Sequence, residues 1–311
     1  MPARAIVTGA AGFIGSHVVD RLLQAGTEVT AIDDLSTGWR ENLAGPLAAG
    51  VRLHEADVRD PTAMRAILAA TRPDAVFHLA ARASVTRSVE EPEDDAAVNV
   101  GGTVTVLEAA RRAGAGRFVY VSTGGALYGE TERIPTPEDA PIRPLSPYGT
   151  GKWAGELYCD LYARLHGAST VTLRLANVYG PRQDPHGEAG VIAIFCERLR
   201  SGAVPTVFGD GRQTRDYVYV GDVAAATVAA ADAQVSGPLN VGTGTEASVL
   251  DLVGALRELG GGQGFEPEHA APRAGELRRS CLDPGRAARE LGWRATTPLR
   301  DGLRATLDSQ A

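Results

Sequence analysis

Tyr148 and Lys152 are two side chains whose types and spacing could support proton transfer. They lie four residues apart, so on a helix they occupy the same face. A nearby cation favours the phenolate, so such a pair can supply a base from a phenol with an ordinary pKa of about 10. The alternative is a chance pair on a solvated helix face, which the spacing alone does not exclude.

Two hydroxyls strengthen the catalytic interpretation. Ser122 and Thr123 close an apolar run that starts at Arg117 and reads as a strand. Ligands bind beyond the carboxyl ends of strands in an open parallel sheet. A hydroxyl at that place could therefore share a hydrogen bond with the tyrosine and with a substrate oxygen.

The elements that must position these groups alternate between strand and helix. We expect strands at 5–8, 28–33, 51–55, 75–79 and 117–122, with helices at 15–25, 62–71 and 98–113 between them. This rhythm predicts an α/β fold with a doubly wound parallel sheet of Rossmann type. Several strands are apolar almost throughout, as expected when helices cover both faces of the sheet.

The rhythm becomes irregular after about residue 173, which suggests a second, smaller α/β domain. We therefore expect a dinucleotide-binding domain over 1–173 and a mainly substrate-binding domain over 174–311. A short strand near 238–241 would return to the first sheet. The glycine-rich stretch 260–264 is expected to connect a helix at 250–259 to the C-terminal segment of the chain.

A glycine-rich loop follows the first expected strand. Gly9, Gly12 and Gly15 open the first helix, where they allow a tight turn and a close approach of backbone N–H groups to a pyrophosphate. Asp33 follows Gly15 by 18 residues and ends the second strand, where a ribose-binding carboxylate belongs. A purely structural turn is the alternative, but the combined context predicts dinucleotide binding.

The acidic residues after the second strand indicate which cofactor binds. Asp33 accepts hydrogen bonds from ribose hydroxyls and repels an added phosphate, so NAD is favoured over NADP. Asp34 adds to this acidity, although Arg40 is near enough in sequence to counter it. Asp57 and Val58 could hold the adenine, and a simple turn aspartate is an equal alternative for Asp57.

Composition excludes several classes of protein. The 311 residues contain 31 lysines and arginines against 38 aspartates and glutamates, and this net charge of −7 argues against a nucleic-acid partner. No apolar stretch approaches the roughly 20 residues of a membrane span, and no signal peptide is recognisable, so we expect a cytoplasmic protein. Three cysteines far apart in sequence indicate reduced thiols and no metal site.

Several ordered motifs together resemble the extended short-chain dehydrogenase/reductases that act on sugar nucleotides, and most closely the UDP-glucose 4-epimerase family. The resemblance spans nearly the whole chain. It rests on segments 7–15, 78–81, 122–123, 128–129, 146–152, 173–182, 215–222 and 240–244, and on Asn99.

The resemblance implies roles for individual residues. Tyr148 would be the acid/base, and Lys152 would lower its pKa and hold the nicotinamide ribose. The NAD-binding residues would further include Gly9, Gly12, Phe13, Ile14, Gly15, Asp33, Asp34, Asp57, Val58, Leu79, Ala80, Ala81 and Asn99. The UDP-sugar would lie against Asn177, Val191, Thr206, Phe208, Arg215, Arg273 and Glu276. For Arg215 or Arg273 taken alone, a surface salt bridge is the alternative.

The chain departs from the family pattern at its catalytic hydroxyl. Aligned on Tyr128 and Gly129, the family's Ser or Thr falls on Gly124, so we expect Thr123 to take that role, with Ser122 as the second choice. Gly124 and Gly125 also cannot supply the Asp-Glu pair of sugar-nucleotide 4,6-dehydratases or the Glu of UDP-glucuronate decarboxylases. Oxidation and re-reduction at one carbon is therefore favoured.

The resemblance implies that Tyr148 takes the proton of the sugar's 4-hydroxyl while NAD accepts a hydride, and that the 4-keto sugar then turns over before re-reduction. Ser280 matches the family position that limits the size of the sugar's 2-substituent. Because serine is small, the resemblance implies that the N-acetylated sugars UDP-GlcNAc and UDP-GalNAc are accepted as well as UDP-glucose and UDP-galactose. UDP-glucuronate is a rival substrate if Arg82, Arg87 or Arg182 meets its carboxylate. Further rivals are a net NAD-dependent oxidoreductase and a non-catalytic NAD-binding regulator.

Family resemblance also implies a homodimer packed through helices at 98–113 and 148–165. Leu157, Leu161 and Leu165 form an apolar stripe on the second of these helices. This stripe could equally pack on the protein's own sheet.

Overall fold

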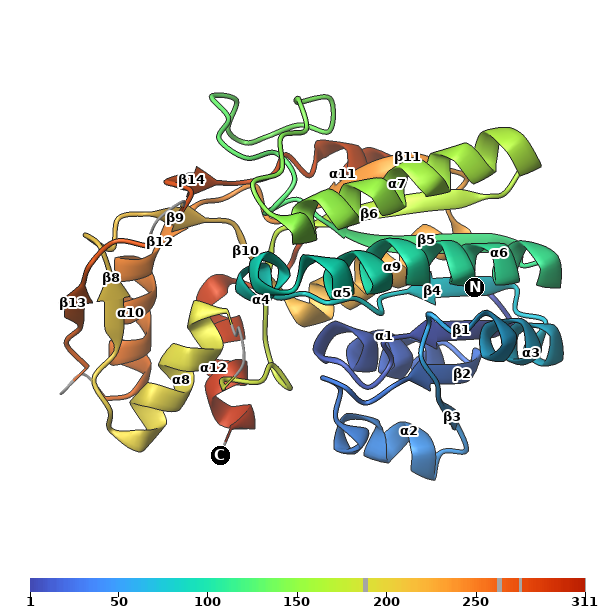
Figure 1. Cartoon of the computed structure of the whole chain (residues 1–311). Coiled ribbons are helices and arrows are strands. Elements are labelled where there is room, and N and C mark those ends of the chain that lie inside the picture. Colours follow the sequence, from blue (N-terminus) through green and yellow to red (C-terminus); the bar gives the residue numbers. More distant parts are fainter. Residues whose placement is uncertain (187–189, 262–264, 274–275, 311) are drawn as a thin grey trace.

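The computed structural model describes residues 1–186, 190–261, 265–273 and 276–310. A seven-stranded sheet forms its centre, with all neighbouring strands parallel (Figure 1). From one edge to the other, its strands are β3 (Arg52–Glu55), β2 (Glu28–Asp33), β1 (Arg4–Thr8), β4 (Ala75–His78), β5 (Arg117–Thr123), β6 (Thr170–Leu175) and β11 (Gly237–Val241). The predicted doubly wound parallel sheet is confirmed.

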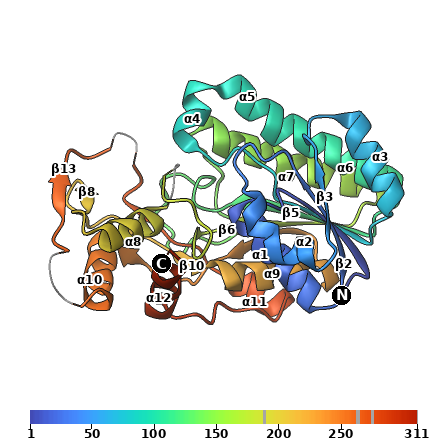
Figure 2. The same cartoon turned by 90° about the horizontal axis from the view of Figure 1, so that it is seen from below.

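Helices cover both faces of this sheet, and Figure 2 shows the three layers edge-on. Alternate residues of a strand point to opposite faces, so Phe118 and Tyr120 pack with one layer and Val119 and Val121 with the other. The first layer contains α3 (Pro61–Thr71), α6 (Thr103–Ala113) and α7 (Pro147–His166). The second contains α1 (Phe13–Gln24), α9 (Val220–Asp232) and α11 (Gly285–Glu290).

Short helices connect the strands on either side. The 3-10 helix η1 (Arg40–Leu43) and α2 (Ala44–Ala48) follow β2. On the α7 side, α4 (Val85–Glu90), α5 (Pro92–Ala96) and the π-helix η2 (Ala97–Gly102) lead into α6. π-helical turns are rare and often mark functional sites, and this one contains Asn99.

The second half of the chain contributes to both parts of the molecule. β11 pairs with β6 in the central sheet, with Gly237 opposite Val171 and Val241 opposite Leu175. Helices α9 and α11 also pack on that sheet, although they come from beyond residue 173. The chain therefore leaves the large unit and returns to it, and the division into 1–173 and 174–311 stays a prediction.

A smaller part lies beside one end of the sheet, at the left of Figure 1, around a core of its own. Its helices are α8 (Val191–Ser201), α10 (Val249–Leu259) and α12 (Leu299–Ser309). Its short strands are β7 (Asn177–Tyr179), β8 (Thr206–Phe208), β9 (Thr214–Arg215), β10 (Tyr217–Tyr219), β12 (Ala247–Ser248), β13 (Glu268–Ala270) and β14 (Arg279–Ser280). Ser248 and Asp251 form a reciprocal capping box that starts α10. Residues 262–264 of the expected connector lie outside the described residues.

All three cysteines, Cys159, Cys196 and Cys281, are buried and free. None of the described helices is both long enough and apolar enough to span a membrane.

Candidate active site

A cavity of about 650 Å³ lies where the carboxyl ends of the central strands meet the smaller part. From the large unit it is lined by predicted residues Phe13, Ile14, Leu79, Ala81, Ser122, Thr123, Tyr148 and Lys152. From the second half of the chain it is lined by Asn177, Val191, Thr206, Phe208, Arg215, Arg273 and Glu276. The structure therefore brings the predicted acid/base group and all the predicted substrate-binding residues into one cavity.

Tyr148 lies in the first turn of α7. That turn is fixed by Ser146, whose Oγ accepts a hydrogen bond from the Gly149 N–H at 3.1 Å, and by Pro147 at the start of the helix. Burial raises the pKa of Tyr148 to about 12, and a hydrogen bond with the Thr123 side chain acts in the opposite direction. In the free chain, Tyr148 is therefore a protonated phenol held against the Thr123 hydroxyl.

Lys152 is one turn further along α7 and is only 4% exposed. Its Nζ donates to the Val121 carbonyl at 2.8 Å and lies 5.1 Å from the centre of the Tyr120 ring. Burial lowers the pKa of Lys152 to about 8. The expected lowering of the Tyr148 pKa by this cation is not found in the free chain, because burial dominates and the ammonium is turned to Val121.

Ser122 and Thr123 have different surroundings. Ser122 Oγ donates to Glu156 Oε1 at 2.6 Å, and Glu156 forms a buried ion pair with Arg174 at 2.7 Å. Arg174 also donates to the Tyr128 hydroxyl at 2.8 Å. Ser122 lines the cavity, but its hydroxyl is engaged with the buried Glu156–Arg174 pair, whereas Thr123 is the hydroxyl beside Tyr148.

Sequence reasoning missed the Glu156–Arg174 pair. A signal was present, because Glu156 follows Lys152 by four residues and so shares its helix face. Arg174 lies within a motif used for the family resemblance. Only the fold shows that these two side chains meet, since one is on α7 and the other on β6.

The loop after β5 explains why the hydroxyl is displaced from position 124. A Cβ on Gly124 would overlap the Leu282 side chain, lying 2.7 Å from its Cδ2. A Cβ on Gly125 would instead have ordinary contacts, 3.6 Å from Asn177 Oδ1 and 4.0 Å from Thr123 Oγ1. A side chain at 124 would therefore have to displace Leu282, while position 125 faces the cavity residues.

The start of α1 fits a dinucleotide pyrophosphate. Gly12 caps this helix without a side-chain hydrogen bond, and no acidic residue occupies the first turn, so its N–H groups suit an anion. Gly9 has a φ of 66°, and a Cβ there would lie 2.6 Å from the Ala80 nitrogen. The absence of a Cβ thus lets the glycine loop and the end of β4 approach closely, with Gly15 packed on Gly9 in the same loop.

The acidic end of β2 fits a ribose. Asp33 Oδ2 accepts from the Ala11 N–H at 2.8 Å and Oδ1 from the Leu35 N–H at 2.9 Å, which orients the carboxylate beside the glycine loop. Asp34 caps its own turn by accepting from Ser36. Arg40, which could have met a 2′-phosphate, is ion-paired with Glu55.

Other predicted cofactor residues have mainly structural contacts in the chain. Asp57 accepts from the Arg59 N–H at 2.8 Å and from Arg59 Nε at 2.9 Å, as a turn aspartate does, and Val58 packs against Gly102. Asn99 holds the backbone of Arg82 through both its amide oxygen and its amide nitrogen, at 3.0 Å each. Cofactor contacts at Asp57, Val58, Ala80 and Asn99 remain predictions.

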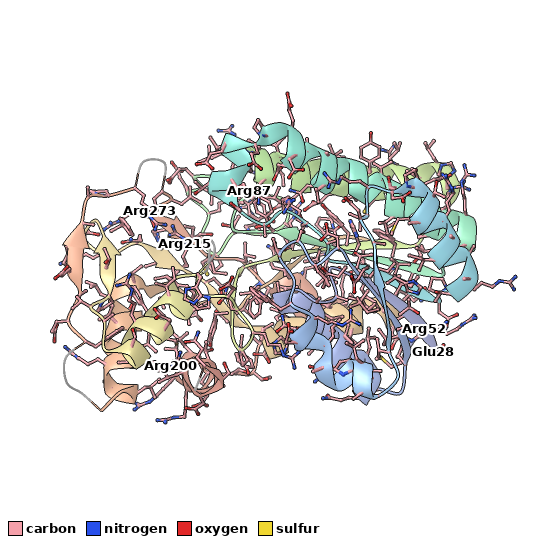
Figure 3. All side chains as sticks on the ribbon, turned by 60° about the horizontal axis from the view of Figure 1, so that its bottom comes forward. Glu28, Arg52, Arg87, Arg200, Arg215 and Arg273 are labelled. Atoms are coloured by element: carbon pink, nitrogen blue, oxygen red, sulfur yellow. The ribbon has the colours of Figure 1, made fainter. Side chains whose placement is uncertain are left out.

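The far end of the cavity carries the groups expected to hold a nucleotide. Arg215 Nη2 lies 3.6 Å from Glu276 Oε1, and the Arg273 guanidinium lies 4.1 Å from the centre of the Phe208 ring. Figure 3 shows Arg215 and Arg273 near one another on the smaller part of the molecule. Two cations, a carboxylate and an aromatic face together suit a nucleoside diphosphate.

The arginines considered for a substrate carboxylate are all engaged elsewhere. Arg82 pairs with Asp94 at 3.1 Å, Arg87 with Glu91 at 2.8 Å and Arg182 with Asp20 at 2.7 Å. None of the three lines the cavity. Their positions support a structural role.

The fold and the site define a nucleotide-dependent enzyme of the short-chain dehydrogenase/reductase type, and comparison with known proteins agrees. The model of the NAD dependent epimerase/dehydratase family matches residues 5–242, and the chain belongs to this family. It is 48% identical over 307 residues to a UDP-glucose 4-epimerase of Mycolicibacterium smegmatis, covering 98% of this chain and 97% of that one.

Solved structures show the same architecture. A UDP-glucose 4-epimerase of Thermotoga maritima with UDP-glucose has 44% identity and a TM-score of 0.95, covering 99% of this chain and 98% of that one. A UDP-glucose 4-epimerase of Thermus thermophilus in complex with NAD has 44% identity and a TM-score of 0.92, covering 98% of each chain. The cofactor class expected from the glycine loop and Asp33 is that of the family.

Proposed function

We propose that this protein is a UDP-hexose 4-epimerase that interconverts UDP-glucose and UDP-galactose. The main observation behind this proposal is that Tyr148 and Thr123 line the same cavity as the groups suited to a nucleotide. Those groups are Arg215, Arg273, Glu276 and Phe208. The relatives named UDP-glucose 4-epimerases support this choice of reaction.

Each group has a defined task in this proposal. Thr123 orients the 4-hydroxyl of the sugar, and Tyr148 takes the proton of that hydroxyl. After the keto sugar has turned over, Tyr148 returns a proton to the 4-keto oxygen while hydride is added to the opposite face of carbon 4. Lys152, held by Val121, keeps a positive charge behind the tyrosine. Bound NAD supplies a reversible hydride acceptor. Arg215 and Arg273 hold the diphosphate while the keto sugar turns over, so the sugar can move without leaving.

The glycines after Thr123 support isomerisation over elimination or decarboxylation. These other reactions need an added acid or base beside the sugar. Gly124 and Gly125 offer none, and the close approach of Leu282 disfavours a side chain at position 124. The proposed reaction needs only the tyrosine and the hydride acceptor.

The proposal extends to UDP-N-acetylglucosamine and UDP-N-acetylgalactosamine. Ser280 lies in β14 directly opposite Arg215 of β9 in the strand register. A serine at that place leaves more room beside the substrate anchor than a large aromatic residue would. UDP-glucuronate is the weaker candidate, since Arg82, Arg87 and Arg182 are ion-paired away from the cavity.

We also propose a homodimer that forms through α6 and α7. Leu157 and Leu165 of α7 are 52% and 65% exposed, so they do not pack on the protein's own sheet. An apolar face of this kind suits a second copy of the same helix pair. Sedimentation velocity of the wild type and of Leu157→Glu tests this assembly. The cytoplasmic location stays a prediction from the sequence.

The experiment that tests the reaction is a proton NMR time course of the purified protein. Separate samples contain UDP-glucose, UDP-N-acetylglucosamine and UDP-glucuronate, each with and without added NAD. We expect UDP-galactose to appear in the first sample and an epimer in the second. Stoichiometric NADH would instead indicate a net oxidoreductase. No change in any sample would favour a binding protein that has lost turnover.

A further inference from the structure

Lys152 is the only lysine in the chain, since arginine provides the other 30 of the 31 basic residues. It is buried, yet no carboxylate of the described residues lies within 4.0 Å of its Nζ. A buried ammonium without a partner is costly and tends to lose its proton. Some charge at longer range must therefore offset this cost if Lys152 is to stay protonated.

Asp95 is a buried carboxylate that faces α7, and its charge acts on Lys152. It belongs to α5, is 3% exposed, and its Oδ1 accepts from Asn99 Nδ2 at 2.8 Å. On its other side it faces α7, because a Cβ on Gly151 would lie 3.3 Å from Asp95 Oδ2. The glycine next to Lys152 thus lets α7 approach Asp95 closely.

The same glycine also meets Asn99. A Cβ on Gly151 would lie 3.1 Å from the Asn99 Cβ, so α5, the π-helix and α7 converge at this point. Asn99 is held by Asp95 on one side and by the Arg82 backbone on the other. Asp95 is therefore placed to act on both Lys152 and Asn99.

The other groups around Lys152 act less directly on its charge. Glu156 is committed to Arg174 and Ser122, and the His78 ring is neutral because burial lowers its pKa to about 3. Burial lowers the pKa of Lys152, whereas the carboxylates of Asp95 and Glu156 raise it, with Asp95 the larger of the two effects. Cys159 stays a neutral thiol, because burial raises its pKa well above the ordinary value. The groups around Lys152 are thus Asp95 from α5, Glu156 and Cys159 from α7, Tyr120 from β5 and His78 from β4. Tyr148 lies one turn before Lys152 on α7.

We propose that Asp95 is a positioning residue that keeps Lys152 in its ammonium form and fixes Asn99 beside it. The role rests on the proposed function of Lys152. Asp95 does not line the cavity, so in this proposal it acts through the lysine. Its loss would leave Lys152 supported only by Glu156, whose charge is already shared with Arg174.

The single lysine permits a direct test that needs no turnover. Protein labelled with carbon-13 at the lysine ε position gives one side-chain resonance, and its shift against pH reports the ionisation of Lys152. In the wild type we expect a midpoint near pH 8. In Asp95→Asn we expect the midpoint to fall by about one pH unit, the lower end of the effect of removing a nearby opposite charge. The alkaline limb of the kcat profile should move in parallel.

Asp94→Asn is the matched control, because this neighbouring carboxylate is 31% exposed and pairs with Arg59 and Arg82. Its lysine midpoint should equal that of the wild type. Equal midpoints in Asp95→Asn and the wild type would overturn the proposal, as would an equal shift in both variants. A shifted midpoint without any epimerase activity would retain the coupling and reject the proposed function instead.

Two further measurements guard against a variant that does not fold. Asp95→Ser removes the charge with a smaller polar side chain, and its midpoint should fall as in Asp95→Asn. In the wild type, the lysine resonance should show a second, smaller inflection on the acid side, where Asp95 gains its proton. Absence of that inflection would contradict the coupling without any substitution.

Discussion

Replacing Gly124 by alanine should destabilise the protein because Leu282 occupies the space of the new side chain. The added Cβ would lie 2.7 Å from Leu282 Cδ2 and 3.1 Å from its Cγ. Leu282 is 1% exposed and its N–H donates to Asp216 at 3.3 Å, so it cannot simply withdraw. The overlap therefore has to be relieved by an unfavourable rotamer or by moving the backbone.

The magnitude follows from two opposing effects. Forcing an extra carbon into a packed core costs about 1–3 kcal/mol. Replacing glycine by alanine at a compatible backbone conformation returns about 0.4–1 kcal/mol through the unfolded chain. Gly124→Ala should therefore lower the free energy of unfolding by about 1–2 kcal/mol. Gly125→Ala, which has only ordinary contacts, should leave it unchanged or slightly raised.

Urea unfolding followed by circular dichroism measures both variants. Leu282→Ala should itself lower the free energy of unfolding. In the double variant, adding Gly124→Ala to Leu282→Ala should lower it no further, because the clashing side chain is gone. Gly125→Ala should affect activity instead of stability, because its new methyl group lies beside Thr123 and Asn177. Its kcat/KM should fall while its free energy of unfolding stays unchanged. Equal stability of Gly124→Ala and Gly125→Ala would refute the explanation of the displaced hydroxyl.

Three further substitutions test the site. Tyr148→Phe should lower kcat by a factor of at least about 100 with unchanged thermal stability, as measured by the epimerisation rate and a melting curve; a loss of less than tenfold would contradict its role. Thr123→Val should lower kcat with little effect on the free energy of unfolding. Ser122→Ala should instead lower the free energy of unfolding by about 1.5–3 kcal/mol, because it removes the hydrogen bond to Glu156. The reverse pattern would exchange the roles of the two hydroxyls. Lys152→Met removes a group whose pKa falls from 10.5 in the unfolded chain to about 8 in the folded chain. Burial of the ammonium therefore lowers the free energy of unfolding of the wild type by its full amount below pH 8, and by less and less as the pH rises to 10.5. Urea unfolding measures the difference in free energy of unfolding between Lys152→Met and the wild type. This difference should shrink by roughly 3 kcal/mol between pH 8 and 10.5. A difference that stays constant over this range would show that Lys152 carries no buried charge.

The sheet and the glycine loop were predictable because their signals are local. An apolar run such as 75–79 reports burial on both faces from its own residues, and Gly9, Gly12 and Gly15 are meaningful only in their fixed order after a strand. The substrate-binding set came from the family resemblance instead. Neither spacing nor composition would have joined Asn177 to Arg273.

The rest depends on contacts between distant segments. Leu282 approaches Gly124 and Arg174 reaches Glu156, and neither pairing can be seen in the sequence alone. The ionisation of Tyr148 also depends on burial, which overrides the effect expected from Lys152 four residues away. Sequence spacing predicts which groups are near one another on a helix, but it does not predict the surroundings that set their pKa.

The most direct test of the central claim follows one atom through the reaction. Purified protein is given UDP-glucose that carries deuterium on carbon 4 of the sugar, and the products are examined by NMR. Oxidation and re-reduction within one site predict UDP-galactose that retains the deuterium on the same carbon, and Tyr148→Phe should slow its formation by a factor of at least about 100. Deuterium lost to the solvent, or no UDP-galactose at all, would contradict the account.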